Sequence, residues 1–244
     1  SGNDKNNRVT GTEGDNLLFG GAGDDTLVGG YVREVEGGRV LDAIGSDILI
    51  GGAGNDLLIP IGGIRDEFGA VSPVGDRYTG LPQNVLIGGL GDDLYVLHVA
   101  GEIVIEEVGE GTDTVWSSVD YVLTDNLEIL HLITAGVEVE TTGTGNRLDN
   151  LLIGSMSANV LVGLDGNDTL MGGWEASTTE PFSDASADDR VVDTLVGGAG
   201  DDTYVILGSS SREGQPDRIV EAAHEGTDTV LSFVSYTLGG YVEN

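Results

Sequence analysis

The chain has 244 residues, of which 42 are acidic and 10 basic, so its formal net charge is 10 − 42 = −32. Without a basic patch to meet phosphate, nucleic acid and anionic membrane surfaces are disfavoured as partners. The absence of cysteine excludes disulfides and thiolate metal sites. Because 39% of the residues are hydrophobic, the chain is too apolar to be a purely disordered acidic segment. We therefore expect a cation, most economically a divalent metal, to offset the self-repulsion of the folded state.

Two broad classes are disfavoured by composition. The 41 glycines are scattered along the chain and each costs about 1 kcal/mol in a helix interior, so short β-strands are predicted instead. No apolar run approaches the roughly 18 residues of a membrane span. No signal peptide is visible, and Ser1-Gly2 suggests that the sequence is a fragment of a larger protein.

A unit of nine residues recurs along the chain, with the pattern Gly-Gly-x-Gly-x-Asp-x-apolar-x. Residues 1–10 are interpreted as a polar, frayed lead-in, and residues 11–19 as a weak first repeat with Asn16 in the aspartate position. The good copies occupy residues 20–28, 51–59, 88–96, 163–171 and 197–205. Further copies are degraded, with asparagine at positions 84, 150 and 159, or are interrupted by insertions at 31–44, 60–82 and 174–190.

A longer period divides the chain into two blocks. The segment that begins GGLGDDLYV at Gly88 recurs as GGAGDDTYV at Gly197, an offset of 109 residues. The sequence predicts a first block over 11–142, with nonapeptides over 11–96 and a β-rich segment over 97–142. The second block covers 143–244, with nonapeptides over 143–205 and a truncated β-rich segment over 206–244.

Each nonapeptide is expected to form a tight six-residue loop followed by a three-residue strand. Glycines allow the positive φ angles of the loop, and the middle strand residue points into a thin apolar core. Two units then make one coil of a right-handed parallel β-roll or β-helix, so the predicted fold class is all-β with loop insertions. Burying each core residue contributes roughly 1.5–3 kcal/mol, which is modest beside the entropy of ordering nine residues.

The aspartate at the sixth position points to a metal. Loops on one edge of the roll stack at every second unit, so their aspartates face one another among inward-aimed carbonyl groups. Such an all-oxygen cage suits a hard cation, and flexible coordination by six or more oxygens favours Ca²⁺ over Mg²⁺.

On these nonapeptides, the chain resembles the RTX (repeats-in-toxin) family of secreted bacterial proteins with hemolysin-type repeats, over nearly all of residues 11–244. The resemblance implies a calcium β-roll, type I secretion, and folding on contact with Ca²⁺ outside the cell. It also implies that the sixth-position aspartate bridges two ions, with loop carbonyl groups completing each site.

The resemblance assigns metal ligands in this sequence. The ligand aspartates are Asp25, Asp47, Asp56, Asp93, Asp168, Asp193 and Asp202. The accompanying loop positions are Gly20, Gly21, Ala22, Gly23, Gly51, Gly52, Ala53, Gly54, Gly88, Gly89, Leu90, Gly91, Gly163, Asp165, Gly166, Gly197, Gly198, Ala199 and Gly200. Sites at Asn16, Asn84, Asn150 and Asn159 are expected to be weaker or empty, because an amide brings no charge. We also predict that all insertions lie on one edge and leave Asp25, Asp56 and Asp93 on an uninterrupted one.

Other polar residues carry weaker signals. Asp113 and Asp228 are expected to bind Ca²⁺ or cap a turn. The carboxylate pair Glu106-Glu107 is expected to be a solvated strand end, the alternative being glycosidase or lyase chemistry. His98, His131 and His224 are expected in surface or strand-packing roles. Trp174 opens an insertion, where it covers the roll or contacts a ligand. A dinucleotide-binding loop is excluded, because no helix follows the glycines.

The predicted function is a calcium-binding region, without catalysis of its own, in a secreted, extracellular or cell-surface protein such as a toxin, adhesin or exoenzyme. Its expected partners are several calcium ions and the type I secretion machinery. The alternative hypothesis is that the insertions form a module that binds a polysaccharide or a cell surface. An enzyme built on the roll would need a polar cluster in a cleft, and the sequence offers none.

Overall fold

The computed structural model describes residues 1–12, 14–35, 38–40, 45–65, 71–72, 83–133, 140–173, 191–207 and 217–242. These residues form strands and turns and contain no helix, so the predicted all-β class is confirmed. Accordingly, no helix in the described part of the chain is long and apolar enough to cross a membrane. Contacts divide the chain into two compact units, Ser1–Val119 with Thr124–Leu127 and Asp120–Leu123 with Glu128–Asn244, called unit 1 and unit 2 below.

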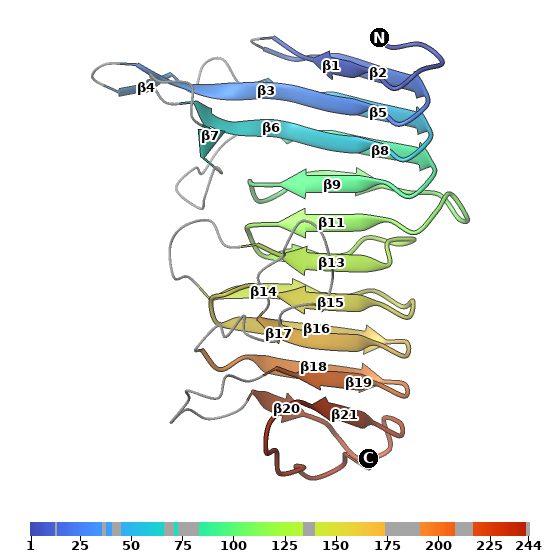
Figure 1. The fold of residues 1–244 in the computed structure, drawn as a ribbon, viewed down its shortest axis with the longest axis vertical. Helices are drawn as coiled ribbons and strands as arrows, with labels where there is room; N and C mark the ends of the chain where they lie inside the picture. The colour runs from blue at the N-terminus through green and yellow to red at the C-terminus, as the bar shows by residue number, and fades with distance from the viewer. Residues whose placement is uncertain are drawn as a thin grey trace. The chain divides into compact units, whose positions relative to one another are not determined.

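Unit 1 contains two sheets of parallel strands, whose members alternate along the chain (Figure 1). The first has the order β1 (Arg8–Thr10), β3 (Thr26–Val35), β6 (Leu57–Arg65), β9 (Leu94–Leu97) and β11 (Thr114–Ser117). The second has the order β10 (Ile103–Ile105), β8 (Val85–Leu90), β5 (Ile48–Ala53) and β2 (Leu17–Ala22). Each nonapeptide therefore contributes one strand and passes the chain to the opposite sheet.

Unit 2 repeats the same plan. One sheet has the order β13 (Ile129–Leu132), β15 (Leu151–Gly154), β17 (Thr169–Gly173), β19 (Thr203–Ile206) and β21 (Thr229–Ser232). The other has the order β12 (Tyr121–Val122), β14 (Thr141–Thr144), β16 (Asn159–Asp165), β18 (Thr194–Ala199) and β20 (Arg218–Val220). This arrangement is the predicted parallel β-roll.

The core of unit 1 is a double stack of eighth-position side chains. In one sheet Leu27 pairs with Leu58, and Leu58 pairs with Tyr95. In the other sheet Leu49 pairs with both Leu18 and Leu86. All of these except Leu18 are fully buried, and Leu18 is 7% exposed. The period of nine therefore places one large apolar side chain per strand in a core that is one residue deep.

The first two insertions leave unit 1 from neighbouring strands. β3 and β6 continue past the nonapeptide and still pair there, for example Arg33 with Arg65. Each then turns back into a short antiparallel strand, β4 (Gly38–Val40) on β3 and β7 (Val71–Ser72) on β6. The prediction that these two insertions share an edge is confirmed within unit 1. The third insertion, residues 174–190, follows β17 in unit 2 and lies outside the described residues.

Candidate metal sites

The sixth-position aspartates of unit 1 form a continuous hydrogen-bonded ladder on the edge without insertions. The backbone amides of Asn7, Asp25, Asp56 and Asp93 donate to Oδ1 of Asp25, Asp56, Asp93 and Asp113, at 2.6, 2.7, 2.6 and 2.8 Å respectively. One carboxylate oxygen of each aspartate thus accepts a hydrogen bond from the backbone of the neighbouring loop. We call this array the inner ladder and this edge the uninterrupted edge of unit 1.

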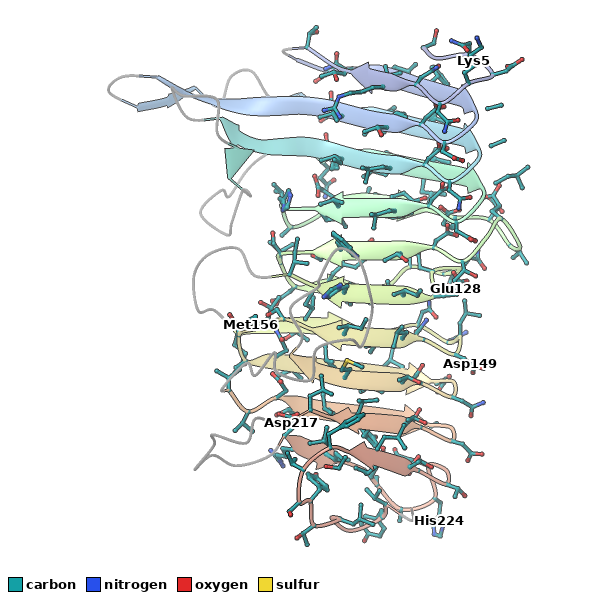
Figure 2. The ribbon with its side chains drawn as sticks, viewed as in Figure 1. Lys5, Glu128, Asp149, Met156, Asp217 and His224 are labelled. Carbon is teal, nitrogen blue, oxygen red and sulfur yellow. The ribbon has the colours of Figure 1, made fainter. Side chains whose placement is uncertain are left out.

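Unit 2 carries an equivalent inner ladder. The amides of Asn150, Asp168 and Asp202 donate to Oδ1 of Asp168, Asp202 and Asp228, at 2.7, 2.7 and 3.0 Å. Figure 2 shows the loops of this edge, marked by Asp149 and His224, at one end of the strands, with Met156 and Asp217 at the other end. The edge with Asp168 and Asp202 is the uninterrupted edge of unit 2, because residues 174–190 precede Asp193 on the other one.

In five of these aspartates the second carboxylate oxygen has no hydrogen-bond partner. Oδ2 is buried and makes no hydrogen bond in Asp25, Asp56, Asp93, Asp168 and Asp202, and each of these residues is at most 2% exposed. Burying a charged oxygen without a partner costs several kcal/mol, unless a proton or a cation compensates it. All five oxygens lie on the uninterrupted edges, where the sequence predicts the cleaner calcium ladder.

Burial changes the acidity of these carboxyl groups. Desolvation raises the pKa of Asp56 and Asp202 to about 6 and that of Asp93 and Asp168 to about 7. Neighbouring carboxylates raise these pKa values further, against the lowering effect of the donated backbone hydrogen bonds. A bound cation would reverse this balance, because it stabilises the ionised form.

The loop backbone closes tightly around each Oδ2 atom. A Cβ atom added to Gly51 would overlap Oδ2 of Asp56 and lie 2.7 Å from the carbonyl oxygen of Gly88 in the next loop. The first glycine therefore leaves room beside a carboxylate and a carbonyl group from two stacked loops. Carboxylate and carbonyl oxygens are the ligands that Ca²⁺ takes in proteins, so the residues present fit a calcium ion.

The interrupted edges have ladders as well, but of mixed composition. Asn16 and Asp47 donate their amides to Oδ1 of Asp47 and Asn84, each at 2.8 Å. In unit 2, Asn159 donates to Asp193 at 2.7 Å and Asp193 to Asp217 at 3.1 Å. Burial raises the pKa of Asp47, and the amide groups of Asn16 lower it in part. Of the two predicted ligands on these edges, Asp47 therefore lies between two asparagines, whereas Asp193 lies between Asn159 and Asp217.

The asparagine loops close on themselves. In Asn7, Asn16, Asn150 and Asn159, Oδ1 accepts the backbone amide of the residue four positions earlier in the same loop, at 2.6 to 3.0 Å. The side-chain amide of Asn16 also donates to the carbonyl oxygens of Thr12 and Gly14 and to Oδ1 of Asp47. An N–H₂ group therefore occupies the centre of this ring of oxygens, which agrees with the expectation of a weak or empty metal site.

A second ladder follows the fifth loop position, which the nonapeptide pattern leaves unspecified. The amides of Asn55, Asp92 and Thr112 donate to Oδ1 of Asp24, Asn55 and Asp92, at 3.0, 3.1 and 2.9 Å. In unit 2 the amides of Asn167, Asp201 and Thr227 likewise donate to Oδ1 of Asp149, Asn167 and Asp201. The only sequence signal for this outer ladder is the recurrence of Asp or Asn before the sixth position.

Three further loops were missed by the sequence pattern. Residues 2–7 are not a frayed lead-in, because β1 pairs with β3 and Asn7 joins the inner ladder. The loops ending at Asp113 and Asp228 continue the stack, and each of these two aspartates is 1% exposed. In the last of these, His224 takes the second position with φ 74°, where four of the five good copies have glycine. The sequence signal that could have identified these three loops is a polar residue at the sixth position followed by an apolar residue at the eighth.

The expectation for Glu106 was wrong. Glu106 is 6% exposed, and one carboxylate oxygen each of Asp93, Glu106 and Asp113 lies within 4.8 Å of the other two. Asp202, Glu221 and Asp228 form the same cluster in unit 2. The error arose because Ile105 pairs with Ile87, which is followed by Gly88, so Glu106 lies beside a glycine and its side chain is buried in the roll rather than exposed to solvent.

The histidines play no part in these clusters. His98 and His131 are buried, whereas His224 lies in an exposed loop. Nδ1 of His98 lies 3.2 Å from the hydroxyl group of Ser118, and burial lowers its pKa to about 4. The strand-packing role expected for His98 therefore agrees with its position.

Together, the stacked loops and the parallel strands define a β-roll whose repeated loops are built for a hard cation. The family model of the RTX calcium-binding nonapeptide repeat matches the chain in four copies, at residues 1–30, 43–59, 144–178 and 192–205. The chain thus carries RTX calcium-binding nonapeptide repeats, which are structural calcium-binding elements. A search of curated proteins gave no match.

Proposed function

We propose that this chain is a calcium-dependent folding region of a secreted protein, with Ca²⁺ held between the stacked loops of the uninterrupted edges. The observation that carries the proposal is the set of five buried Oδ2 atoms without partners. Asp25, Asp56, Asp93, Asp168 and Asp202 would hold the ions together with loop carbonyl groups, and Asp47 and Asp193 would contribute on the interrupted edges.

Calcium would act as a switch for folding. At low Ca²⁺ the formal charge of −32 and the unpaired buried oxygens oppose the folded state. An unfolded chain can pass a narrow type I exporter. Outside the cell, ions that bind only the folded state stabilise it, by about 2.7 kcal/mol per site when free Ca²⁺ is about one hundred times Kd. The folded roll would then support the larger toxin, adhesin or exoenzyme to which it belongs.

Circular dichroism of the whole chain tests this proposal. We expect a chelator to abolish the β-signal and added Ca²⁺ to restore it, with the same midpoint when followed by tyrosine fluorescence. Native β-structure that persists after complete removal of calcium would contradict the proposal.

A second candidate function rests on the insertions of unit 1. β3 and β6 pair beyond the nonapeptides, so the described bases of the two insertions lie side by side. We propose that the two insertions contact a polysaccharide or a cell surface. Replacing residues 31–44 and 60–82 each by a short glycine linker, which removes both insertions, should then remove surface binding and leave the calcium-dependent dichroism unchanged. Retained binding after this replacement would refute this role.

A further inference from the structure

The last loop of each inner ladder carries a side chain where the earlier loops have none. Ile50, Ile87 and Ile105 are aligned in neighbouring strands, so Glu106 takes the place of the first glycines Gly51 and Gly88. A Cβ atom on Gly51 would lie 2.7 Å from the carbonyl oxygen of Gly88, and one on Gly88 would lie 2.6 Å from Oε1 of Glu106. A carboxylate oxygen therefore replaces the carbonyl oxygen of the preceding loops.

Unit 2 reaches the same arrangement with a different local sequence. Val220 pairs with Val196, which places Glu221 beside Gly197. Glu221 then joins Asp202 and Asp228, as Glu106 joins Asp93 and Asp113. The same replacement thus occurs at the end of both ladders.

Two carboxylates in each cluster have a buried oxygen without a hydrogen-bond partner. Oδ2 of Asp93 and Oε2 of Glu106 are buried without a hydrogen bond, and the two residues are 2% and 6% exposed. Oδ2 of Asp202 and Oε2 of Glu221 are also buried without a partner. Free carboxylates at this separation repel one another, and a cation among them would remove both the repulsion and the unpaired oxygens.

A tyrosine fixes the glutamate in each cluster. The hydroxyl group of Tyr95 donates to Oε1 of Glu106, and that of Tyr204 donates to Oε1 of Glu221. Tyr204 additionally accepts the amide of Gly197 at 2.8 Å. Both tyrosines are fully buried at the eighth position, where the preceding uninterrupted-edge units have leucine. One glutamate oxygen is therefore held in place, while the other is left for a ligand.

On the footing of the proposed calcium role, we infer that each unit ends its inner ladder in a separate three-carboxylate Ca²⁺ site that binds more tightly than the nonapeptide loops. Asp93, Glu106 and Asp113 form this site in unit 1, and Asp202, Glu221 and Asp228 form it in unit 2. A pair of nonapeptide loops offers two aspartates, and here a third carboxylate is added. Calcium affinity rises with the number of charged ligands and with the rigidity of the site. All the ligands are oxygens, which suits Ca²⁺ or a lanthanide ion rather than Zn²⁺.

Calcium titration of the whole chain at low free Ca²⁺ tests this inference. We expect the tightest class to contain one ion for each of the two clusters. Glu106→Gln and Glu221→Gln should each lower the Ca²⁺ affinity of one of the two sites by about tenfold or more, and the double variant should lower the affinity of both. Glutamine keeps the size of the side chain and the acceptor for the tyrosine. Glu107→Gln is the matched control, because this exposed neighbour undergoes the same change of charge and should alter nothing.

A second readout does not depend on any variant. When tyrosine is excited in the wild-type protein, Tb³⁺ emission should arise mostly from the first equivalents added, because Tyr95 and Tyr204 adjoin the two clusters. An unchanged tightest class in the double variant would overturn the inference and make each glutamate a neutral group bonded to its tyrosine. Emission that grows only at high Tb³⁺ would do the same. A wild-type chain that binds no Ca²⁺ would instead refute the proposed function.

Discussion

Leu164 has a strained backbone conformation in the nonapeptide 163–171. It occupies the second position of the loop 163–168 with φ 89°, whereas Gly21, Gly52 and Gly198 hold the equivalent position with φ 123°, 124° and 105°. A side chain in the left-handed region costs roughly 1–2 kcal/mol. The side chain of Leu164 is 43% exposed and gains little from burial in return.

We therefore predict that Leu164→Gly stabilises the calcium-loaded protein by about 1 kcal/mol. Urea denaturation in saturating Ca²⁺ measures the change. The control is Leu90→Gly, an exposed third-position residue of an equivalent loop that is not among the positive-φ residues. It should lose stability, because glycine adds backbone freedom to the unfolded chain. Equal effects of the two substitutions would argue against strain at Leu164.

His98 should make the folding stability of the roll fall as the pH is lowered, an effect that the buried carboxyl groups do not produce. Burial lowers its pKa from 6.5 in the unfolded chain to about 4 in the fold, so the folded state favours the neutral ring. The contribution of His98 to stability is therefore complete above pH 6.5 and is lost as the pH falls toward 4.

Between pH 7 and pH 5, the wild-type protein should lose about 2 kcal/mol more stability than His98→Gln. Subtracting the two proteins removes the opposite effect of Glu102, whose pKa burial raises to about 7. Urea denaturation at both pH values in saturating Ca²⁺ gives the difference. His224→Gln, at an exposed histidine, should follow the wild type, and a similar response in both variants would exclude the buried ring as the cause.

At the scale of a single loop, neighbouring residues of one chemical type have different tasks. Asp25 is 2% exposed and belongs to the inner ladder, whereas Asp24 is exposed and belongs to the outer ladder. In each case an asparagine would keep the Oδ1 acceptor and remove one negative charge. The pair therefore separates the effect of position from the effect of net charge.

We predict that Asp25→Asn raises the Ca²⁺ concentration needed for half-maximal folding and that Asp24→Asn leaves it nearly unchanged. Losing one ion would lower stability by roughly 3 kcal/mol when free Ca²⁺ is about one hundred times Kd. Circular dichroism during calcium titration of both variants measures the midpoints. Equal midpoint shifts would indicate that Oδ2 of Asp25 does not bind an ion.

The period of nine was sufficient to predict the parallel roll and the stacking of Leu27, Leu58 and Tyr95, because a strict repeat leaves few ways to bury one side chain per strand. It also placed Asp25, Asp56 and Asp93 in one line. It did not predict that residues 2–7 form a loop, because this segment keeps the spacing of Gly2 and Asn7 but matches few other residues of the nonapeptide pattern. Nor did it predict the burial of Glu106, which depends on which residue of the neighbouring strand lies beside it.

The amide of Asn16 explains another limit of the sequence pattern. A sixth-position asparagine could in principle supply an oxygen to a metal, and only the structure shows its N–H₂ group directed at the oxygens of its own loop. The residue four positions earlier is not glycine in this loop, nor in those of Asn7, Asn150 and Asn159. Each of these four self-closed loops thus combines a non-glycine second position with a sixth-position asparagine, whereas the loop of Asp168 has Leu164 at the second position and an aspartate at the sixth.

For the whole molecule, screening and specific binding make different predictions. Salt at about 1 M reduces the Debye length to about 3 Å and relieves repulsion among exposed charges. It does not supply partners for buried oxygens such as Oδ2 of Asp56. Mg²⁺ would supply charge, but it keeps its waters and prefers near-ideal octahedral geometry.

We therefore expect neither about 1 M NaCl nor excess Mg²⁺ to fold the calcium-free chain, although millimolar Ca²⁺ does so. Far-ultraviolet circular dichroism after exhaustive chelation and buffer exchange is the measurement. Full recovery of β-structure in NaCl alone would show that the net charge of −32, rather than the inner ladder, controls folding.

The first insertion separates Gly30 from Gly45 in the sequence, yet the loop still makes the hydrogen bonds of its fifth and sixth positions. Ser46 still donates its amide to Oδ1 of Asp15 at 2.9 Å, and Asp47 donates to Asn84 at 2.8 Å. A loop interrupted between its second and fourth positions thus keeps the fifth- and sixth-position hydrogen bonds of an unbroken loop. The roll is therefore a natural grafting scaffold: an unrelated peptide introduced at this point would be displayed at the surface without altering the coil beneath it.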